Sequence, residues 1–263
     1  MSKIAVVTGA SSGIGRATAA ILAAKGVKVY GLSRSEKPQE GVIYVPCDVQ
    51  DEGSVKAAVG RVADENGRID ILVCCAGMGI SGAVEFTDPA ESYRQIDVNL
   101  FGTDRTVRAA LPVMRSRGEG RIVLISSVAA VTPIPFQTWY SASKAAINSY
   151  AMALANEIRP YGVTISVVMP GDIKTGFTAA RKKNAAGDDV YGGRIGRSVS
   201  RMERDEQNGM PVEAAGAIVA KAALSRHAKP LRSTGFVYSL LCVLVKILPA
   251  RLARWVLYQM YAK

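Results

Sequence analysis

The stretch Ile4-Ala5-Val6-Val7-Thr8-Gly9-Ala10-Ser11-Ser12-Gly13-Ile14-Gly15 joins a short β-branched run to a glycine-rich turn and a segment of helix length. Gly9 permits a sharp exit from the strand, Gly13 permits close approach to a pyrophosphate, and Gly15 permits the helix to pack on the strand. The N–H groups and positive dipole at the start of that helix favour phosphate oxygens. The spacing G-x3-G-x-G therefore predicts a dinucleotide site whose contacts come from Gly9, Ser11, Ser12, Gly13, Ile14 and Gly15.

Beyond this turn, apolar runs of strand length alternate with segments of helix length. The run at 69–74 shows no polar alternation, which is typical of a strand buried on both faces. The βαβαβ order predicts an α/β, single-domain Rossmann fold: a doubly wound parallel sheet with helices on both faces and a C-terminal helical extension. We expect strands at 4–7, 27–32, 43–45, 69–74, 122–126 and 163–169, and helices at 15–25, 54–66, 91–114 and 141–159.

One domain spanning residues 1–263 accounts for the chain, because no repeat or low-complexity linker interrupts it. Within that domain, residues 1–176 form the expected cofactor-binding and catalytic core. Residues 177–209 are polar, glycine-rich and charged, and indicate a mobile substrate-loop insertion over a site. Residues 210–263 are expected to form a C-terminal cap or tail.

The positive charge is concentrated at the end of the chain. The formal net charge is +11, yet residues 214–263 alone hold eight basic residues and no acidic residue. The preceding part of the chain is nearly balanced. The charge therefore does not indicate a nucleic-acid-binding protein.

Histidine and cysteine are scarce. One histidine, His227, and four cysteines without a CxxC pair exclude His-rich metal sites, and we predict no metal. Free thiols in apolar surroundings fit a reducing cytosol. The sequence contains neither a signal-peptide core near its start nor a run of ~18 apolar residues. We therefore expect a cytoplasmic protein.

The end of the second predicted strand bears on the choice of cofactor. Dinucleotide folds usually place an acid there to hold the ribose 2′-hydroxyl, but this strand ends in Gly31-Leu32-Ser33-Arg34. The Arg34 guanidinium suits a 2′-phosphate through a charge-assisted hydrogen bond, and the hydroxyls of Ser12 and Ser33 add donors. These residues favour NADP(H). A solvated Arg34 with Glu36 nearby is the alternative, which leaves NAD(H) open.

Tyr140 and Lys144 lie at i and i+4, on one face of a predicted helix. A phenol titrates near ~10 and is a poor acid–base at neutral pH. A nearby ammonium favours the phenolate and lowers its pKa. A tuned tyrosine can then donate a proton to a developing alkoxide, or accept one from an alcohol.

Two further residues accompany this pair. Ser127 follows the predicted strand at 122–126 and precedes Tyr140 by thirteen residues, and Asn99 lies in Asp97-Val98-Asn99 on a predicted helix. With the glycine-rich turn, these residues resemble the short-chain dehydrogenase/reductase family over residues 3–175. The resemblance implies that Tyr140 is the catalytic acid/base and that Ser127 stabilises the substrate oxygen. It implies that Lys144 binds the nicotinamide ribose and lowers the Tyr140 pKa, while Asn99 holds a proton-relaying water.

The same resemblance implies further cofactor contacts. Asp48, followed by Val49, matches the position that contacts the adenine. The segment 170–175 resembles the P-G-x3-T loop that frames the nicotinamide carboxamide. Its implied contact residues are Pro170, Gly171, Ile173 and Thr175.

One departure from the family pattern is clear. The family usually has N-N-A-G after the fourth strand, whereas this chain has Cys74-Cys75-Ala76-Gly77. Ala76 and Gly77 still permit close backbone approach to the cofactor. The hydrogen bonds that the asparagines make to neighbouring backbone are absent, so we expect this segment to be less rigid than in the family. Packed, inert thiols are one interpretation of the cysteines, and a redox role is the other.

The predicted substrate is a lipophilic carbonyl or alcohol, because the segments expected to line the cleft, 78–84 and 128–139, are rich in apolar residues. Packing of these residues into the core is the alternative. Residues 235–261 are apolar with scattered cations, Trp and Tyr, a pattern that fits a cap over the cleft, a subunit contact or an interfacial membrane helix. This tail resembles those of the 17β-hydroxysteroid dehydrogenase type 1-like and acyl-dihydroxyacetone-phosphate reductase-like branches, which implies steroids, retinoids or lipid ketones.

Three functions remain open from sequence. The first is an NADP(H)-dependent oxidoreductase acting on a lipophilic ketone, secondary alcohol or aldehyde. The second is a 3-ketoacyl-thioester reductase in which Arg181 and Lys182 dock an acidic carrier. The third is a non-catalytic NADP-binding sensor, which has no use for a tuned phenol. A homodimer or homotetramer is expected in each case.

Overall fold

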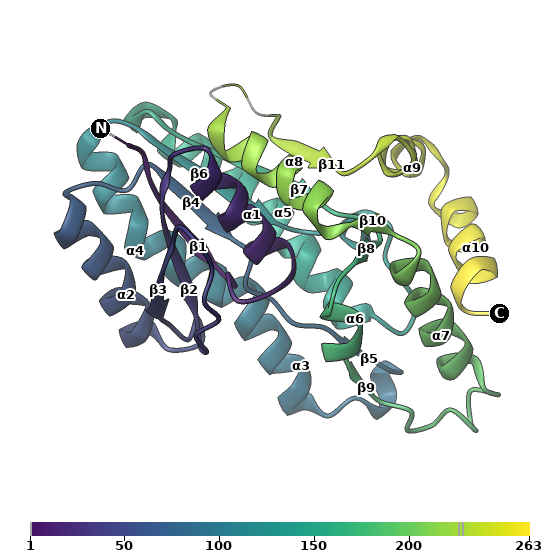
Figure 1. Cartoon of the computed structure of the whole chain (residues 1–263). Helices are drawn as coiled ribbons and strands as arrows, with labels where there is room; N and C mark the ends of the chain where they lie inside the picture. The colour runs from purple at the N-terminus through teal and green to yellow at the C-terminus, as the bar shows by residue number, and fades with distance from the viewer. Residues whose placement is uncertain (1, 226, 228) are drawn as a thin grey trace.

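The chain forms a parallel sheet between two layers of helices in a computed structural model, which describes residues 2–225, 227 and 229–263 (Figure 1). The sheet has seven strands in the order β11-β7-β6-β4-β1-β2-β3. The predicted fold class is confirmed. The strands are β1 Ile4–Thr8, β2 Lys28–Ser33, β3 Val42–Pro46, β4 Ile71–Cys74, β6 Gly120–Ile125, β7 Val163–Met169 and β11 Leu231–Ser233.

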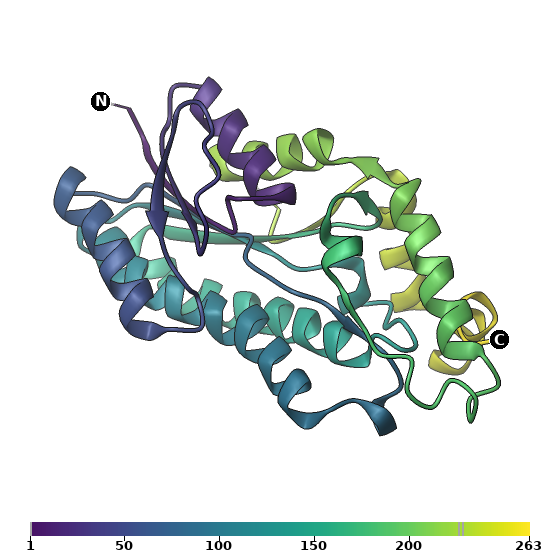
Figure 2. The same ribbon diagram turned by 60° about the horizontal axis from the view of Figure 1, so that its bottom comes forward.

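Two helices cover one face of the sheet and three cover the other (Figure 2). On the first face, α1 (Gly13–Ala24) and α8 (Val212–Leu224) pack closely, since a Cβ at Gly216 would lie 2.7 Å from the Ala17 Cβ. The opposite face is covered by α2 (Glu52–Asn66), α4 (Gly102–Arg117) and α5 (Thr138–Ile158). Each fully buried aliphatic side chain contributes roughly 1.5–3 kcal/mol. These two cores hold the carboxyl ends of the strands along one edge.

The helix predicted at 91–114 is interrupted. It consists of α3 (Pro89–Ile96), a wider π-helical turn at 97–101, and α4. The Thr103 hydroxyl donates to the Asn99 carbonyl over 2.8 Å. Single π-helical turns within α-helices occur frequently at functional sites. This turn buries Asn99 completely and directs it toward the end of β4.

The insertion predicted at 177–209 contains regular structure. It includes α6 (Phe177–Ala180), β9 (Lys182–Lys183) and α7 (Arg194–Gln207), and β9 pairs with β5 (Ile80–Ser81). A small third core joins α7 to residues of the segments expected to line the cleft. Its buried members are Ala83, Ile195, Val199 and Met202, against which Phe86, Ile134, Phe136, Tyr191 and Tyr261 pack. Core packing, the alternative interpretation, therefore applies to Ile134 and Phe136.

The predicted C-terminal segment begins as part of the core. After the short pairing of β8 (Ile173–Lys174) with β10 (Met210–Pro211), α8 packs on α1 and β11 forms the edge of the sheet beside β7. The extension itself is α9 (Phe236–Ile247) and α10 (Ala250–Tyr261). Among the described residues, no helix combines the length and apolar character needed to span a bilayer.

Candidate active site

The glycine-rich turn brings three chain segments together at the carboxyl edge of the sheet. A Cβ at Gly9, whose φ is +66°, would lie 2.9 Å from the Ala76 nitrogen, and a Cβ at Gly15 would lie 2.4 Å from the Gly9 oxygen. Gly13, whose φ is +52°, faces Thr175, with 3.9 Å between its ideal Cβ and the Thr175 Cβ. The turn leaves room only for backbone on its inner side. Its free N–H groups at the start of α1 fit a dinucleotide pyrophosphate.

Thr8 supplies hydrogen bonds to the backbone after β4, where the family usually has two asparagines and this chain has Cys74 and Cys75. Its Oγ1 accepts hydrogen bonds from the backbone nitrogens of Cys75 and Ala76, over 3.1 Å and 3.2 Å. Burial raises the pKa of the Cys75 thiol to about 12 and raises that of Cys74 further above its usual range. Both thiols are therefore neutral at physiological pH, as expected of packed, inert cysteines.

A cavity of about 150 Å³ lies at the ends of β1 and β2, where the adenosine ribose is expected. Ser11 and Ser33 line it, together with Glu36 and Lys37. Arg34 is exposed beside it. Lys37 was not predicted from the sequence, where its only signal is its position three residues after Arg34. The lining of the cavity thus offers one cation, Lys37, and one carboxylate, Glu36, while Arg34 lies on the exposed loop beside it.

The predicted adenine contact lies next to this cavity. The backbone nitrogen of Cys47 donates to the Ser33 oxygen over 3.0 Å, which places the following Asp48 beside the end of β2. Asp48 accepts a hydrogen bond from the Gln50 nitrogen over 3.0 Å. Val49 packs against Gly102 at the start of α4.

The catalytic candidates converge at the ends of β6 and α5. Tyr140 and Lys144 lie in the first two turns of α5, with the Lys144 Nζ 5.8 Å from the Tyr140 ring centroid. Ser127 stands at the end of β6, where its Oγ accepts the Ala129 N–H over 3.1 Å and donates to the Pro170 oxygen over 3.4 Å. Ser127 is also close enough to Tyr140 to lower the pKa of its phenol, against the effect of burial.

Asn99 joins this group through the end of β4. Its amide accepts from the Met78 nitrogen over 2.8 Å and donates to the Met78 oxygen over 3.1 Å and to the Ser143 Oγ over 3.0 Å. A Cβ at Gly77 would lie 3.3 Å from the Asn99 Oδ1 and 3.7 Å from the Lys144 Nζ. Gly77 therefore lets the two side chains approach the same backbone segment. The water-holding role of Asn99 stays a prediction.

Burial controls the protonation of the central pair. It lowers the pKa of Lys144 to about 8, and the ammonium donates to the Ile125 oxygen over 2.9 Å. Burial also raises the pKa of Tyr140, opposed by hydrogen bonding from Ser127 and by the charge of Arg181. The protein alone thus holds Tyr140 protonated, as a proton donor must be. The lowering of the Tyr140 pKa by Lys144 stays a prediction.

A family model described as short chain dehydrogenase matches residues 3–186. The chain belongs to the short-chain dehydrogenase family. It is an oxidoreductase that acts on CH–OH groups with NAD(P), and the resemblance stated from sequence is confirmed.

Relatives of this short-chain dehydrogenase match from two thirds of the chain to nearly all of it. A Bacteroides thetaiotaomicron protein named 3-ketodihydrosphingosine reductase is 39% identical over 236 residues, covering 88% of this chain and 87% of that protein. Human 17-beta-hydroxysteroid dehydrogenase type 1 is 37% identical over 191 residues, covering 66% and 58% respectively. A solved short-chain dehydrogenase from Streptomyces avermitilis superposes with a TM-score of 0.81 and 28% identity, covering 97% of each chain.

This dehydrogenase places three residues beside Tyr140 that the sequence analysis did not assign to the site. The Phe177 ring lies 5.9 Å from the Tyr140 ring, and the Arg181 guanidinium lies 5.6 Å from the Phe177 ring. Arg181 pairs with Glu206 of α7. It is 4% exposed, so the predicted docking of a carrier by Arg181 is wrong. Lys182 is exposed but is paired with Glu91 over 2.8 Å.

The loop at 170–175, predicted to frame the nicotinamide, is held by the C-terminal helix α9. A Cβ at Gly171 would lie 2.2 Å from the Tyr238 ring of α9, and the Tyr238 hydroxyl donates to the Asp172 carboxylate. On the other side, the Pro170 oxygen accepts the Val128 N–H over 2.9 Å. Ile173 lies in β8, and the Thr175 Oγ1 accepts the Phe177 N–H over 3.1 Å. The loop is therefore held between the turn that follows β6, at 128–130, and α9.

Proposed function

We propose that this short-chain dehydrogenase is an NADP(H)-dependent reductase of a long-chain lipid ketone. The observation that carries the proposal is the position of Tyr140, whose pKa is influenced by the nearby Ser127 and whose ring lies 5.9 Å from the apolar ring of Phe177. The relative named 3-ketodihydrosphingosine reductase supports a lipid substrate, because it matches over 88% of this chain. The steroid-acting relative matches over only 66% of the chain, so a steroid or retinoid is the less supported substrate.

The arrangement supports a direct proton transfer. When bound, the nicotinamide supplies the hydride to the carbonyl carbon. Ser127 would hold the carbonyl oxygen, because its hydroxyl adjoins that of Tyr140. Tyr140 would then donate its proton to the developing alkoxide, and the buried Lys144 would favour the phenolate that remains. In the direction of alcohol oxidation, the same groups would act in reverse.

The cofactor preference rests on the cavity at the ends of β1 and β2. Arg34 and Lys37 offer cations to a 2′-phosphate, and Ser11 and Ser33 offer hydroxyl donors. Glu36 opposes them, since a carboxylate facing a phosphate is repelled. Lys37 balances Glu36 within the lining, and the exposed Arg34 beside the cavity adds a further cation, which supports NADP(H), with NAD(H) as the weaker cofactor.

The two other functions have less support. A carrier-bound 3-ketoacyl thioester would need a docking surface, and the cations predicted for it are buried or paired. A non-catalytic sensor would not need Ser127, Tyr140, Lys144 and Asn99 gathered at one edge of the sheet.

We further propose a cytoplasmic homo-oligomer. Phe101, in the π-helical turn before α4, and Met152 of α5 are exposed, and a second copy would cover such residues. Cys47, Cys74, Cys75 and Cys242 are free thiols, which supports a reducing compartment. The exposed C-terminal helices support peripheral contact with a membrane, and this contact is developed below.

The test is NADPH oxidation with three ketones: a long-chain 2-amino-3-ketone in detergent, estrone, and an acetoacetyl thioester. We expect turnover with the long-chain ketone and none above background for the Tyr140→Phe variant. Preferred turnover of the thioester would favour the carrier-linked function. Binding of NADPH without turnover of any ketone would favour a sensor.

A further inference from the structure

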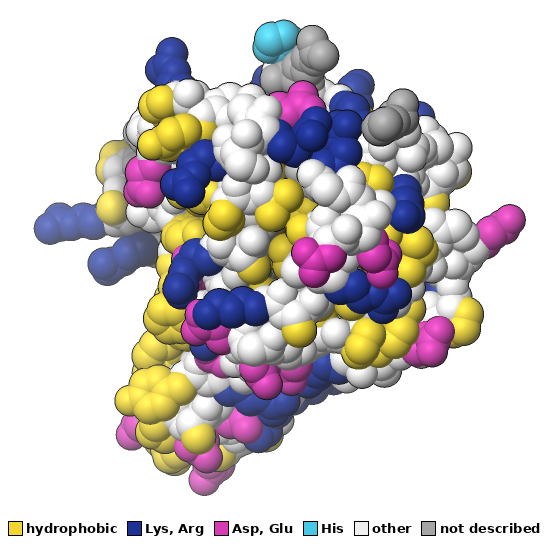
Figure 3. All heavy atoms as spheres, turned by 90° about the vertical axis from the view of Figure 1, so that its left-hand side faces the viewer, with side chains coloured by type: hydrophobic (Ala, Val, Ile, Leu, Met, Phe, Trp, Pro, Cys, Tyr) yellow, Lys and Arg dark blue, Asp and Glu magenta, His cyan; other side chains and the backbone are white. Residues whose placement is uncertain are grey.

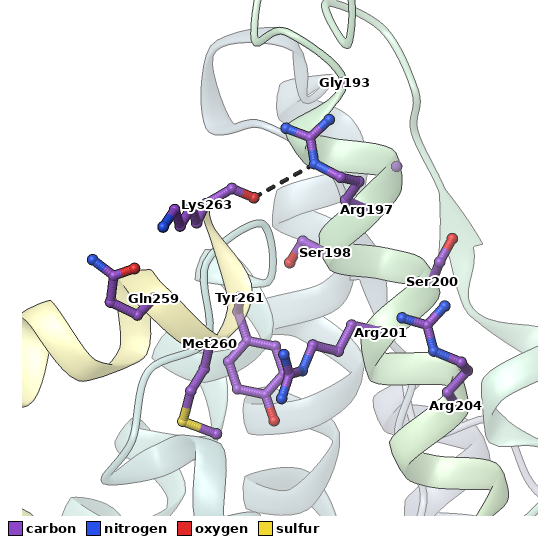
Figure 4. Close-up of a pocket in the computed structure, with 11 residues that line it drawn as sticks. Gly193, Arg197, Ser198, Ser200, Arg201, Arg204, Gln259, Met260, Tyr261 and Lys263 are labelled. Carbon is purple, nitrogen blue, oxygen red and sulfur yellow. Dashed lines mark hydrogen bonds between the residues drawn. The ribbon is translucent and has the colours of Figure 1, made fainter.

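A second cavity, separate from the dinucleotide site, lies between α7 and α10 (Figure 4). Its volume is about 700 Å³. The polar side chains that line it are mainly cationic. The lining includes the side chains of Arg197, Ser198, Arg201, Arg204, Tyr261 and Lys263.

The cations of this basic pocket are only partly neutralised. The Arg201 Nε lies 3.9 Å from the Asp205 carboxylate, and its guanidinium stacks 5.6 Å from the Tyr261 ring centroid. Arg197 donates to two backbone oxygens, those of Gly192 over 3.1 Å and Lys263 over 3.5 Å. Among the described residues, neither Arg204 nor Lys263 has a carboxylate within ion-pair distance. Among the described residues, Asp205 is the acidic side chain paired within this pocket, and the main-chain carboxyl oxygen of Lys263 also lies against Arg197. Four cations still exceed these anionic groups, and the pocket attracts an anion.

Ser198 provides an independent sign of a ligand. It is 2% exposed, yet its Oγ has no hydrogen-bond partner among the described residues. The side chain points from α7 into the space in front of α10 (Figure 4). Buried hydroxyls are nearly always hydrogen-bonded. An anionic oxygen in the pocket would accept the Ser198 proton and complete its bonding.

The same end of the molecule carries an unpartnered apolar face. On α9, four residues recur at helical spacing and face solvent, including Phe236 at 82% and Ile247 at 75% exposure; the full stripe is Phe236, Leu240, Val243 and Ile247. On α10, Trp255 is 58% exposed. By contrast, positive and negative side chains intermingle on the opposite end of the molecule (Figure 3).

We propose that the basic pocket binds the phosphate headgroup of an anionic phospholipid, while the α9 stripe enters the surface of the bilayer. Apolar residues beside cations and Trp are typical of interfacial helices on anionic membranes. A second copy is the weaker occupant, because a two-fold contact would bring identical basic surfaces together. The proposal rests on the proposed function in one respect: a lipid ketone would be drawn from that bilayer.

The docking surface and the active site share a helix. Tyr238 of α9 packs on Gly171 and bonds to Asp172 in the nicotinamide loop. A membrane that orders α9 would therefore act directly on the loop that frames the nicotinamide. The lipid surface would serve both as the source of substrate and as a support for the loop.

The experiment is co-sedimentation of the full chain with phosphatidylcholine vesicles, with and without phosphatidylglycerol. We expect binding that requires phosphatidylglycerol and weakens with salt. The triple variant Arg197→Gln, Arg201→Gln, Arg204→Gln should bind roughly a hundredfold more weakly, at about fivefold per cation. A matched control, Lys25→Gln, Lys56→Gln, Arg61→Gln, removes the same charge from the opposite end and should bind like the wild type.

Two single substitutions distinguish specific binding in the pocket from non-specific electrostatic attraction to an anionic membrane. Ser198→Ala should weaken binding to phosphatidylglycerol vesicles several-fold without altering net charge. Ile247→Ser should weaken it by shortening the apolar stripe. Soluble glycerol phosphate at equal phosphate concentration should not displace the vesicles; if it does, the ligand is a free phosphate ester and the membrane proposal is wrong.

Three further results would overturn the proposal. They are equal losses in the triple variant and its control, binding to an acyl carrier protein in place of vesicles, and dimerisation abolished by Ile247→Ser. NADPH oxidation with the detergent-dissolved ketone tests the proposed function separately. The triple variant should retain that activity, so a failed membrane assay leaves the catalytic proposal standing.

Discussion

Replacing Lys144 by Met is expected to stabilise the protein while removing activity. Burial lowers the pKa of Lys144 from 10.5 to about 8, because the ammonium loses hydration in the core. At ~1.4 kcal/mol for each pKa unit, the folded state at pH 7 carries a cost of about 3 kcal/mol. Met has a similar length and no charge, and it removes this cost.

A second effect reduces the gain. The Lys144 ammonium donates to the Ile125 oxygen over 2.9 Å, and loss of that donor costs roughly 1–2 kcal/mol. The net gain at pH 7 is therefore about 1–2 kcal/mol, or roughly 2–6 °C in Tm for a chain of this size. Activity should fall at least ~100-fold, since the charge beside Tyr140 is lost.

The pH dependence fixes the sign of the effect. Between pH 8 and 10.5 the unfolded wild type binds more protons at Lys144 than the folded protein, so the wild-type stability rises with pH. The destabilisation of the folded state by the buried Lys144 ammonium is fully present below pH 8 and absent above pH 10.5. The gain of the Met variant should therefore shrink as the pH rises.

The assay is urea unfolding of wild type and variant at pH 7 and pH 9.5, without cofactor. A variant less stable than the wild type at pH 7 would refute the reasoning. So would a stability difference that stays constant between the two pH values. Lys144→Gln, which keeps a donor for Ile125, serves as the control for the lost hydrogen bond.

Three other changes test separate parts of the site. Arg34→Ala should weaken NADPH binding about tenfold or more and leave NADH binding unchanged, as measured by cofactor fluorescence; equal effects on both would contradict the assignment of the 2′-phosphate. Gly15→Ala should abolish dinucleotide binding in the same titration, because its Cβ would lie 2.4 Å from the Gly9 oxygen; near-normal affinity would exclude the turn as the phosphate site. Tyr238→Phe should lower the free energy of unfolding by about 1–3 kcal/mol in urea, because the half-buried Asp172 loses its donor; unchanged stability would show that the hydroxyl does not hold the loop.

The fold and the catalytic candidates could be predicted because their signals are local. Strand-length runs and glycine spacing report on a few adjacent residues, and Tyr140 and Lys144 share a helix face at i and i+4. Ser127 was found through its position at the end of a strand. Each of these patterns can be recognised in the sequence without knowledge of the tertiary structure.

Other features depend on contacts between distant segments and could not be predicted. Arg181 lies in a charged, glycine-rich stretch that resembles solvated surface, yet Glu206, 25 residues away, pairs with it in the interior. The contact between Tyr238 and Gly171 joins residues of two separate elements. The π-helical turn that directs Asn99 is likewise not encoded by apolar periodicity, since the helix pattern continues through it.

The most direct test of the catalytic assignment is single-turnover oxidation of NADPH by a long-chain 2-amino-3-ketone, comparing wild type with Tyr140→Phe. The Phe variant keeps the ring beside Phe177 and removes only the proton that the ketone must receive. We predict unchanged NADPH affinity and a rate at least ~100-fold lower than that of the wild type. A Phe variant that oxidises NADPH at the wild-type rate would contradict the role of Tyr140.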